Sequence, residues 1–119
     1  MANPFVHIEL NTRDLDAAKG FYGELFDWTM KELALPNGTY ITIAVGGGTG
    51  GGMRVHPVAG APSSWLPYVL VNDIEAATEK ARALGASIVE DVTEIPGMGW
   101  MSIIRDPTGA ALGLWKFLD

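Results

Sequence analysis

Two side chains that can exchange a proton, His7 and Glu9, stand two residues apart near the start of the sequence. In residues 5–11, three aliphatic residues alternate with polar or aromatic ones, and a period of two predicts a half-buried strand. His7 and Glu9 then share the face opposite the aliphatic residues, where a carboxylate can orient an imidazole for ligand contact or proton transfer. The bland alternative is a hydrogen-bonded histidine without a catalytic role, and the spacing leaves both interpretations open.

No other residues form a recognisable catalytic group. The sequence has no cysteine, which excludes disulfides, thiolate metal sites and a cysteine nucleophile. Ser63 and Ser64 have no identified base, and Ser102 lacks the sharp turn that a hydrolase serine needs. The glycine-rich run 46–52 leads into a strand-like segment rather than a helix. It therefore predicts a hairpin loop or flap and not a phosphate-binding loop.

The elements that must position these residues come in two copies. A shift of 59 residues places 10–30 on 69–89 and matches Asp14 with Asp73. One further residue of shift matches 36–43 with 96–103. Each half is therefore one copy of a unit that cannot bury its apolar surface alone.

Each copy predicts one strand, one helix and three further strands. The helices are expected near 14–26 and 73–84, where apolar residues recur on one helical face behind an aspartate that can cap the first turn. The strands after them are expected at about 28–34, 39–45, 51–56, 86–94, 99–105 and 110–117. The predicted fold is α+β, with two tandem βαβββ modules at about 4–56 and 65–117 and a linker at about 57–64, in a single domain of residues 1–119.

Composition excludes several functional classes. The net charge is −6, which argues against a nucleic-acid partner because phosphates need a basic face; it is compatible with a cationic ligand. No apolar run approaches the roughly 20 residues of a membrane-spanning helix. The first residues carry no basic and apolar leader pattern. These features lead us to expect a cytoplasmic protein without a membrane partner.

Three segments carry a resemblance to a known family. They are "FVHIELNTRDLDAAKGFYGELFDW" at 5–28, "YVLVNDIEAATEKARALGASIVED" at 68–91, and "IIRDPTGAALGLW" at 103–115, which is similar to the ending D-P-x-G-N-x-x-E-L. With the double βαβββ pattern, they resemble the vicinal oxygen chelate superfamily of glyoxalase I, extradiol dioxygenases, and fosfomycin and bleomycin resistance proteins. The resemblance covers nearly the whole chain. It implies a half-barrel with a concave cleft, and a homodimer, in which edges and apolar patches are covered.

The resemblance also implies where metal ligands would stand. His7 matches the first ligand position, but Leu66 occupies the second and Gly113 the third, and the corresponding place in the first module falls near Gly52. One histidine does not retain a transition metal, because such sites need about three protein ligands. We therefore predict no bound metal and no cofactor.

The strand phases and the resemblance together predict the residues of the cleft. They are His7, Glu9, Trp28, Tyr40, Thr42, Tyr68, Trp100, Ser102 and Trp115. The first functional interpretation is a metal-free small-molecule-binding protein, in the manner of the bleomycin resistance proteins, which sequester an aromatic, positively charged drug. The alternative is a lyase, isomerase or epimerase that uses His7 and Glu9, with or without a divalent metal. A third is an assembly or regulatory module whose cleft is vestigial.

Overall fold

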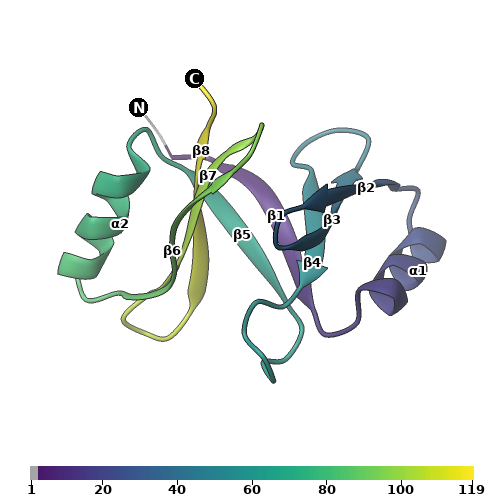
Figure 1. The fold of residues 1–119 in the computed structure, drawn as a ribbon, viewed down its shortest axis with the longest axis horizontal. Coiled ribbons are helices and arrows are strands. Elements are labelled where there is room, and N and C mark those ends of the chain that lie inside the picture. Colours follow the sequence, from purple (N-terminus) through teal and green to yellow (C-terminus); the bar gives the residue numbers. More distant parts are fainter. Residues whose placement is uncertain (1–2) are drawn as a thin grey trace. The chain divides into compact units, whose positions relative to one another are not determined.

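A computed structural model describes residues 3–119, which fold into the two predicted βαβββ modules (Figure 1). The first module contains β1 (Phe5–Thr12), α1 (Leu15–Leu25), β2 (Thr29–Leu35), β3 (Gly38–Ala44) and β4 (Gly51–Val55). The second contains β5 (Ser64–Leu70), α2 (Ile74–Ala83), β6 (Ser87–Ile95), β7 (Gly99–Arg105) and β8 (Ala111–Phe117). The predicted ends of both helices, and of the strands after them, lie within one residue of these bounds, so the α+β class and the element order are confirmed.

The strand order is the same in both halves. The first sheet runs β2-β3-β4-β1 and the second runs β6-β7-β8-β5. In each sheet the first and last strands of the module pair in parallel, β1 with β4 and β5 with β8, while the other pairs are antiparallel. Because both the order and the sense of pairing repeat, the two halves are copies of one unit.

The compact units differ slightly from the predicted module boundaries. Residues 7–66 form one unit, and residues 67–119 form the other together with the described residues 3–6. The N-terminal residues join the second unit through Leu70, whose N–H donates to the Pro4 carbonyl at 2.9 Å. The Leu70 carbonyl accepts from the Asn3 amide at 2.8 Å. The predicted linker 57–64 belongs with the first unit, and the single-domain assignment stays a prediction.

Both helices begin as their sequences predict. Asp14 accepts a hydrogen bond from the Ala17 N–H at 3.0 Å, and Asp73 accepts one from the Ala76 N–H at the same distance. Each cap satisfies a backbone donor that the first helical turn leaves open, an effect of about 1 kcal/mol. After α2, Gly85 takes a φ of 103°, a conformation that glycine adopts without strain and that commonly ends helices.

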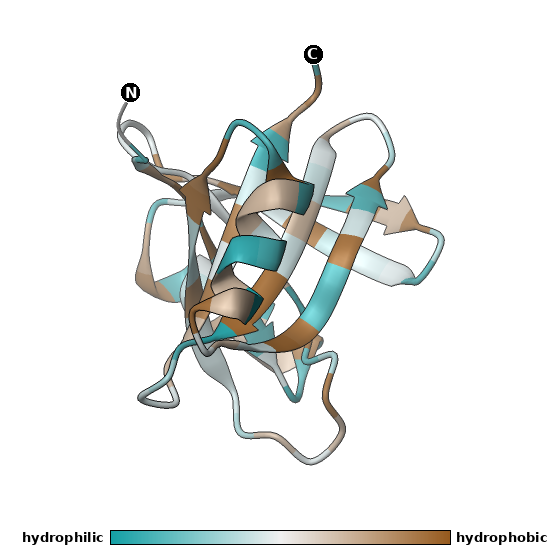
Figure 2. Ribbon diagram, turned by 90° about the vertical axis from the view of Figure 1, so that its left-hand side faces the viewer, coloured by the Kyte–Doolittle hydropathy of each residue, from teal (hydrophilic) through white to brown (hydrophobic). Residues whose placement is uncertain are grey.

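The core of the first unit lies between its sheet and α1. Its four buried members come from β1, β3 and β4, and the side chains of α1 cover them; these members are Leu10, Ile41, Ile43 and Met53. Because side chains alternate along a strand, the neighbours of these residues face away from α1. In Figure 2, which turns α2 toward the viewer, apolar and polar bands likewise alternate along the strands behind the helix.

The second sheet departs from the predicted offset of 60 residues. Ile41 pairs with Met53 in the first sheet, and Ser102 pairs with Leu114 in the second, so both partners differ by 61. The pairing of β6 with β7 is irregular, with register shifts on either side of Glu90. A slip of one residue moves a side chain to the other face of a sheet. The predicted match of Thr42 with Ser102 is therefore wrong.

Ser102 accordingly lies against α2 and not on the opposite face. Its side chain is fully buried, and its Oγ lies 2.9 Å from Thr78 Oγ1 on α2. Trp100 shares this face of β7 by strand alternation, and the Lys116 Nζ lies 4.6 Å from the centre of its ring. The prediction that Trp100 and Ser102 line the face opposite the helix is wrong, because the offset in this strand is one residue longer than assumed.

The buried hydroxyl pair gives a testable expectation. Thr78 Oγ1 donates to the Ile74 carbonyl at 2.7 Å, so Ser102 must donate to Thr78. Ser102→Ala should lower the free energy of unfolding by about 1 kcal/mol, and Thr78→Val by about 1–3 kcal/mol, because the latter leaves the Ser102 hydroxyl without its acceptor. Urea unfolding of the double variant should show less than the sum of the two losses. Strict additivity would contradict the shared bond.

Candidate functional site

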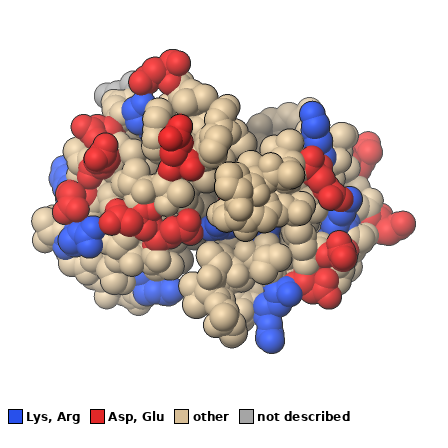
Figure 3. Space-filling model, in the orientation of Figure 1, with Lys and Arg blue, Asp and Glu red and all other residues tan. Residues whose placement is uncertain are grey.

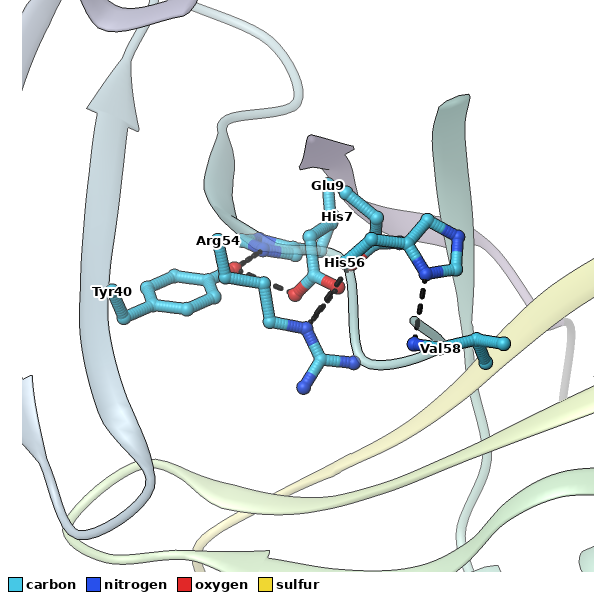
Figure 4. Close-up of polar contacts among 7 residues, drawn as sticks. His7, Glu9, Tyr40, Arg54, His56 and Val58 are labelled. Carbon is cyan, nitrogen blue, oxygen red and sulfur yellow. Dashed lines mark hydrogen bonds and ion pairs between the residues drawn. The ribbon is translucent and has the colours of Figure 1, made fainter. Parts of the chain in front are cut away.

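Four polar side chains meet on the face of the first sheet opposite α1. His7 and Glu9 come from β1, Tyr40 from β3 and Arg54 from β4. Tyr40 precedes the core residue Ile41, and strand alternation therefore turns it away from α1. Figure 4 shows these side chains directed toward one another. We call these four residues the polar array.

Hydrogen bonds connect the polar array into a chain. Tyr40 Oη donates to Glu9 Oε2 at 2.9 Å and lies 2.7 Å from His7 Nε2. Arg54 Nε donates to Glu9 Oε1 at 3.2 Å and to Asn11 Oδ1 at 3.1 Å. A tyrosine hydroxyl carries one proton, and here that proton points to the carboxylate. His7 Nε2 must then carry the proton of its own bond, which puts the imidazole lone pair on Nδ1.

The charged members of the array are withdrawn from water. Glu9 is 4% exposed as a residue, and the Arg54 side chain is 15% exposed. A buried carboxylate is costly unless a cation and further hydrogen bonds compensate it. Arg54 supplies the cation and Tyr40 a further hydrogen bond. The array is therefore a fixed set of polar groups and not a pair of mobile surface charges.

Burial also affects His7. Desolvation lowers the pKa of His7 below its usual 6.5, because burial disfavours the charged imidazolium. The neutral ring agrees with the hydrogen-bond directions in the array. At neutral pH His7 is thus a base with its lone pair on Nδ1.

This lowered pKa predicts a dependence of stability on pH. The unfolded chain takes up a proton at His7 near pH 6.5, whereas the folded protein resists it until lower pH. The free energy of unfolding should therefore fall as pH decreases from about 6.5 through the pKa of the folded state. Urea unfolding at several pH values should show this fall in the wild type, and His7→Gln should flatten it over that interval. An NMR titration in which His7 protonates above pH 6.5 would contradict the prediction.

Six of the nine predicted residues lie on the expected face of their sheets. In the first module these are His7, Glu9, Tyr40 and Thr42, and in the second they are Tyr68 and Trp115. Thr42 stands between two core residues and pairs with Gly52. Tyr68 pairs with Gly113, and its ring centre lies 6.5 Å from that of Trp115 at 89°. Contact of any of the six with a ligand stays a prediction.

Trp28 lies on the other face of its sheet. It packs against the α1-side core, with its ring centre 5.9 Å from Tyr22 and 6.4 Å from Trp65. Met30, two residues later, packs on the same core, as strand alternation requires. The prediction that Trp28 lines the face opposite the helix is therefore wrong.

The sequence analysis missed two residues of this face, Arg54 and Asn11. Both follow from the same alternation, because Asn11 is two residues after Glu9 and Arg54 is two residues after Gly52. The second histidine, His56, instead accepts a hydrogen bond from the Val58 N–H at 3.0 Å (Figure 4). It serves a turn after β4 and takes no part in the printed bonds of the array.

The described residues do not fit the metal site that the family resemblance implies. A Cβ added to Gly52 would lie 2.2 Å from Tyr40 Oη, and one added to Gly113 would lie 2.3 Å from Tyr68 Cδ2. Tyrosine rings therefore fill the space that a carboxylate side chain would need at either position. Among residues 3–119, no three histidine, aspartate or glutamate side chains are grouped as metal ligands.

The surface adds two negative findings. Acidic and basic side chains are interspersed on the face shown in Figure 3, which carries no continuous basic patch over the described residues. No helix in residues 3–119 is long and apolar enough to cross a membrane. The first finding agrees with the absence of a nucleic-acid partner predicted from the charge.

Comparison with known proteins gives relatives over most of the chain. The relative "Putative glyoxylase CFP32" of Mycobacterium tuberculosis (strain CDC 1551 / Oshkosh) is 34% identical over 114 residues, which cover 92% of this chain and 44% of that protein. The "Anthracycline biosynthesis protein DauV" of Streptomyces sp. (strain C5) is 27% identical over 123 residues, covering 91% and 45%. The chain thus spans less than half the length of these relatives.

Solved structures share the fold at low identity. The methylmalonyl-CoA epimerase from Mycobacterium tuberculosis matches with a TM-score of 0.70 at 15% identity and covers 97% of this chain and 88% of that one. Hypothetical protein BH1468 from Bacillus halodurans C-125 matches at 0.71 and 12%, covering 100% and 97%. The model of the Glyoxalase/Bleomycin resistance protein/Dioxygenase superfamily matches residues 5–114. The chain belongs to that superfamily.

Proposed function

We propose that this protein binds a small organic molecule on the polar-array face of the first module, without a metal ion. The observation that carries the proposal is the convergence of His7, Glu9, Tyr40 and Arg54 from three strands onto one face. Small-molecule sites usually combine an apolar wall with a few fixed polar groups. The family membership supports the same class of function, because relatives include a protein named for anthracycline biosynthesis. A cytoplasmic location is part of the proposal.

A binding screen with matched variants tests the proposal. Tryptophan fluorescence would be titrated with a library of aromatic cations and small organic acids. Tyr40→Phe should weaken a binding compound by about 5–10-fold, the scale of one lost hydrogen bond within the array. Tyr22→Phe is the matched control, because Tyr22 lies on the α1 side, and it should leave affinity unchanged. Equal affinity of both variants for every binding compound would contradict the site, as would failure of the whole library to bind.

A second candidate function is proton transfer, as in an isomerase, epimerase or lyase. The specific observation is that neutral His7 connects to Glu9 through the Tyr40 hydroxyl. If His7 Nδ1 accepts a proton from a ligand C–H, the Nε2 proton can pass to Tyr40 and the tyrosine proton to Glu9, so that the ring stays neutral. Proton NMR in D₂O should show exchange of that C–H in a bound ligand and its loss in His7→Gln. A binding compound that never exchanges leaves the binding function alone.

The predicted homodimer is also part of the proposal, and the C-terminal part of α1 supplies a surface for it. Phe21 and Leu25 are 60% and 55% exposed, and Phe26 is 45% exposed. Gly20 and Gly23 have no atom within 4 Å of an added Cβ, although glycine within a helix costs about 1 kcal/mol. Exposed aromatic side chains beside a bare helix backbone fit a second copy that presents the same patch across a twofold axis.

Sedimentation tests this dimer. The wild type should sediment at about twice 12.7 kDa at micromolar concentration, and Phe21→Glu should give the monomer. Phe117→Glu is the control, since Phe117 is 52% exposed at the far end of β8, and it should remain dimeric. A monomeric wild type, or a dimer that survives Phe21→Glu, would contradict the proposed surface.

A further inference from the structure

The polar array converges on one oxygen atom. His7 Nε2 lies 2.7 Å from Tyr40 Oη, and Glu9 Oε2 lies 2.9 Å from the same atom. An imidazole nitrogen and a carboxylate oxygen that point to one position are the first two ligands of a typical divalent-cation site. Here that position is taken by a neutral hydroxyl from β3.

The same hydroxyl blocks the neighbouring strand. Gly52 pairs with Glu9 across the parallel β1–β4 ladder. A Cβ at Gly52 would lie 2.2 Å from Tyr40 Oη and 2.5 Å from Tyr40 Cζ, a distance that side-chain carbons do not reach. A side chain at position 52 and the tyrosine ring at position 40 therefore exclude each other. Glycine at 52 is what allows the ring to reach His7 and Glu9.

Charge opposes a cation at this position as well. Arg54 Nε donates to the other oxygen of Glu9 at 3.2 Å, which places a guanidinium beside the carboxylate. A second positive charge would have to enter next to it without an additional carboxylate to compensate. Among residues 3–119, no further acidic side chain joins His7 and Glu9 in a metal-ligand group.

We propose that Tyr40 and Gly52 form a coupled pair that fills a latent divalent-cation site whose ligands are His7 and Glu9. The Tyr40 hydroxyl holds the two ligands in the directions that an ion would otherwise fix. Exchange of the pair for a small residue at 40 and a carboxylate at 52 opens the position and supplies a third ligand. The proposal concerns cation binding, and it stands whether or not a small molecule binds this face.

Cobalt titration of designed variants tests the pair. Co²⁺ binding would be followed by its visible absorption and by equilibrium dialysis, on protein whose folding is checked by circular dichroism. The double variant Tyr40→Ala/Gly52→Glu should bind Co²⁺ at least 100-fold more tightly than the wild type, and adding His7→Ala should remove the gain. The matched control is Tyr68→Ala/Gly113→Glu, which makes the equivalent exchange in the second module, where no histidine is present. It should show no gain.

Two further measurements keep the proposal falsifiable if the double variant does not fold. Tyr40→Ala alone should bind Co²⁺ at least 10-fold more tightly than the wild type, in a manner that His7→Ala reverses. The wild type itself should show no His7-dependent Co²⁺ binding at stoichiometric concentration. Stoichiometric binding by the wild type that His7→Ala abolishes would overturn the proposal. Folded Tyr40 variants that bind no better than the wild type would also overturn it.

Discussion

Replacement of Gly113 with alanine is expected to lower the free energy of unfolding by about 1–3 kcal/mol, the usual range for overpacking a core. The added Cβ would lie 2.3 Å from Tyr68 Cδ2 and 2.4 Å from Cε2. The Tyr68 side chain is 2% exposed, so its ring cannot swing into solvent to make room. Urea unfolding measures the loss.

Two variants frame this expectation. Gly47→Ala should change stability by less than about 0.5 kcal/mol, because Gly47 has nothing within 4 Å of an added Cβ. Tyr68→Leu should restore part of the loss in the Gly113→Ala background, since the smaller side chain gives the methyl group room. If Gly113→Ala proves as mild as Gly47→Ala, Tyr68 does not pack on Gly113 as described.

Removal of the Glu9 carboxylate should cost about 3 kcal/mol of unfolding free energy, because it leaves the largely buried guanidinium of Arg54 without its carboxylate. Glu9→Ala also takes the acceptor from the Tyr40 hydroxyl. Glu9→Gln keeps the shape and one acceptor oxygen, and its loss should be smaller. Chemical unfolding at neutral pH compares the two variants.

The exposed pair of Glu79 and Arg82 provides the matched control. Their side chains are 69% and 47% exposed, at 3.3 Å, and exposed ion pairs contribute less than about 1 kcal/mol. Glu79→Ala should therefore be nearly neutral. Equal losses for Glu9→Ala and Glu79→Ala would mean that the carboxylate of Glu9 is not held in a buried pair.

The sequence predicted the fold well because its signals are local and repeated. Strand alternation, the aspartate caps and the offset between the halves define each element, and the same order of elements occurs twice. The pairing of Leu70 with Pro4 and Asn3 escaped prediction. It joins residues far apart in the chain, and a pattern of polar and apolar residues carries no record of such pairing.

The candidate site was predicted only where the strand phase was clear. His7 and Glu9 alternate with aliphatic residues, so their face followed directly. The irregular pairing around Glu90 changed the offset of β7, which put Trp100 and Ser102 on the α2 side. Such irregularities depend on backbone geometry, and the apolar pattern of β6 does not reveal them.

The central role of Tyr40 could not be read from the sequence either. Its hydroxyl meets His7 and Glu9 only because Gly52 on the next strand leaves space for the ring. That space depends on three strands at once, since β1, β3 and β4 each contribute one side of it. Sequence reasoning assigned Tyr40 to a face, whereas the structure assigns it a position at the centre of the polar array.

The most direct test of the metal-free binding site is NMR mapping with the small-molecule library on isotopically labelled protein. Prior chelator treatment removes any adventitious ion. A binding compound should shift the signals of His7, Glu9, Tyr40 and Arg54 in metal-free protein, and Tyr40→Phe should reduce these shifts at equal ligand concentration. A groove beside α2, lined by Ala77, Lys80, Ile104 and Leu114 among others, is the natural competitor. Shifts confined to that groove, or binding that requires an added divalent ion, would contradict the metal-free site on the first module.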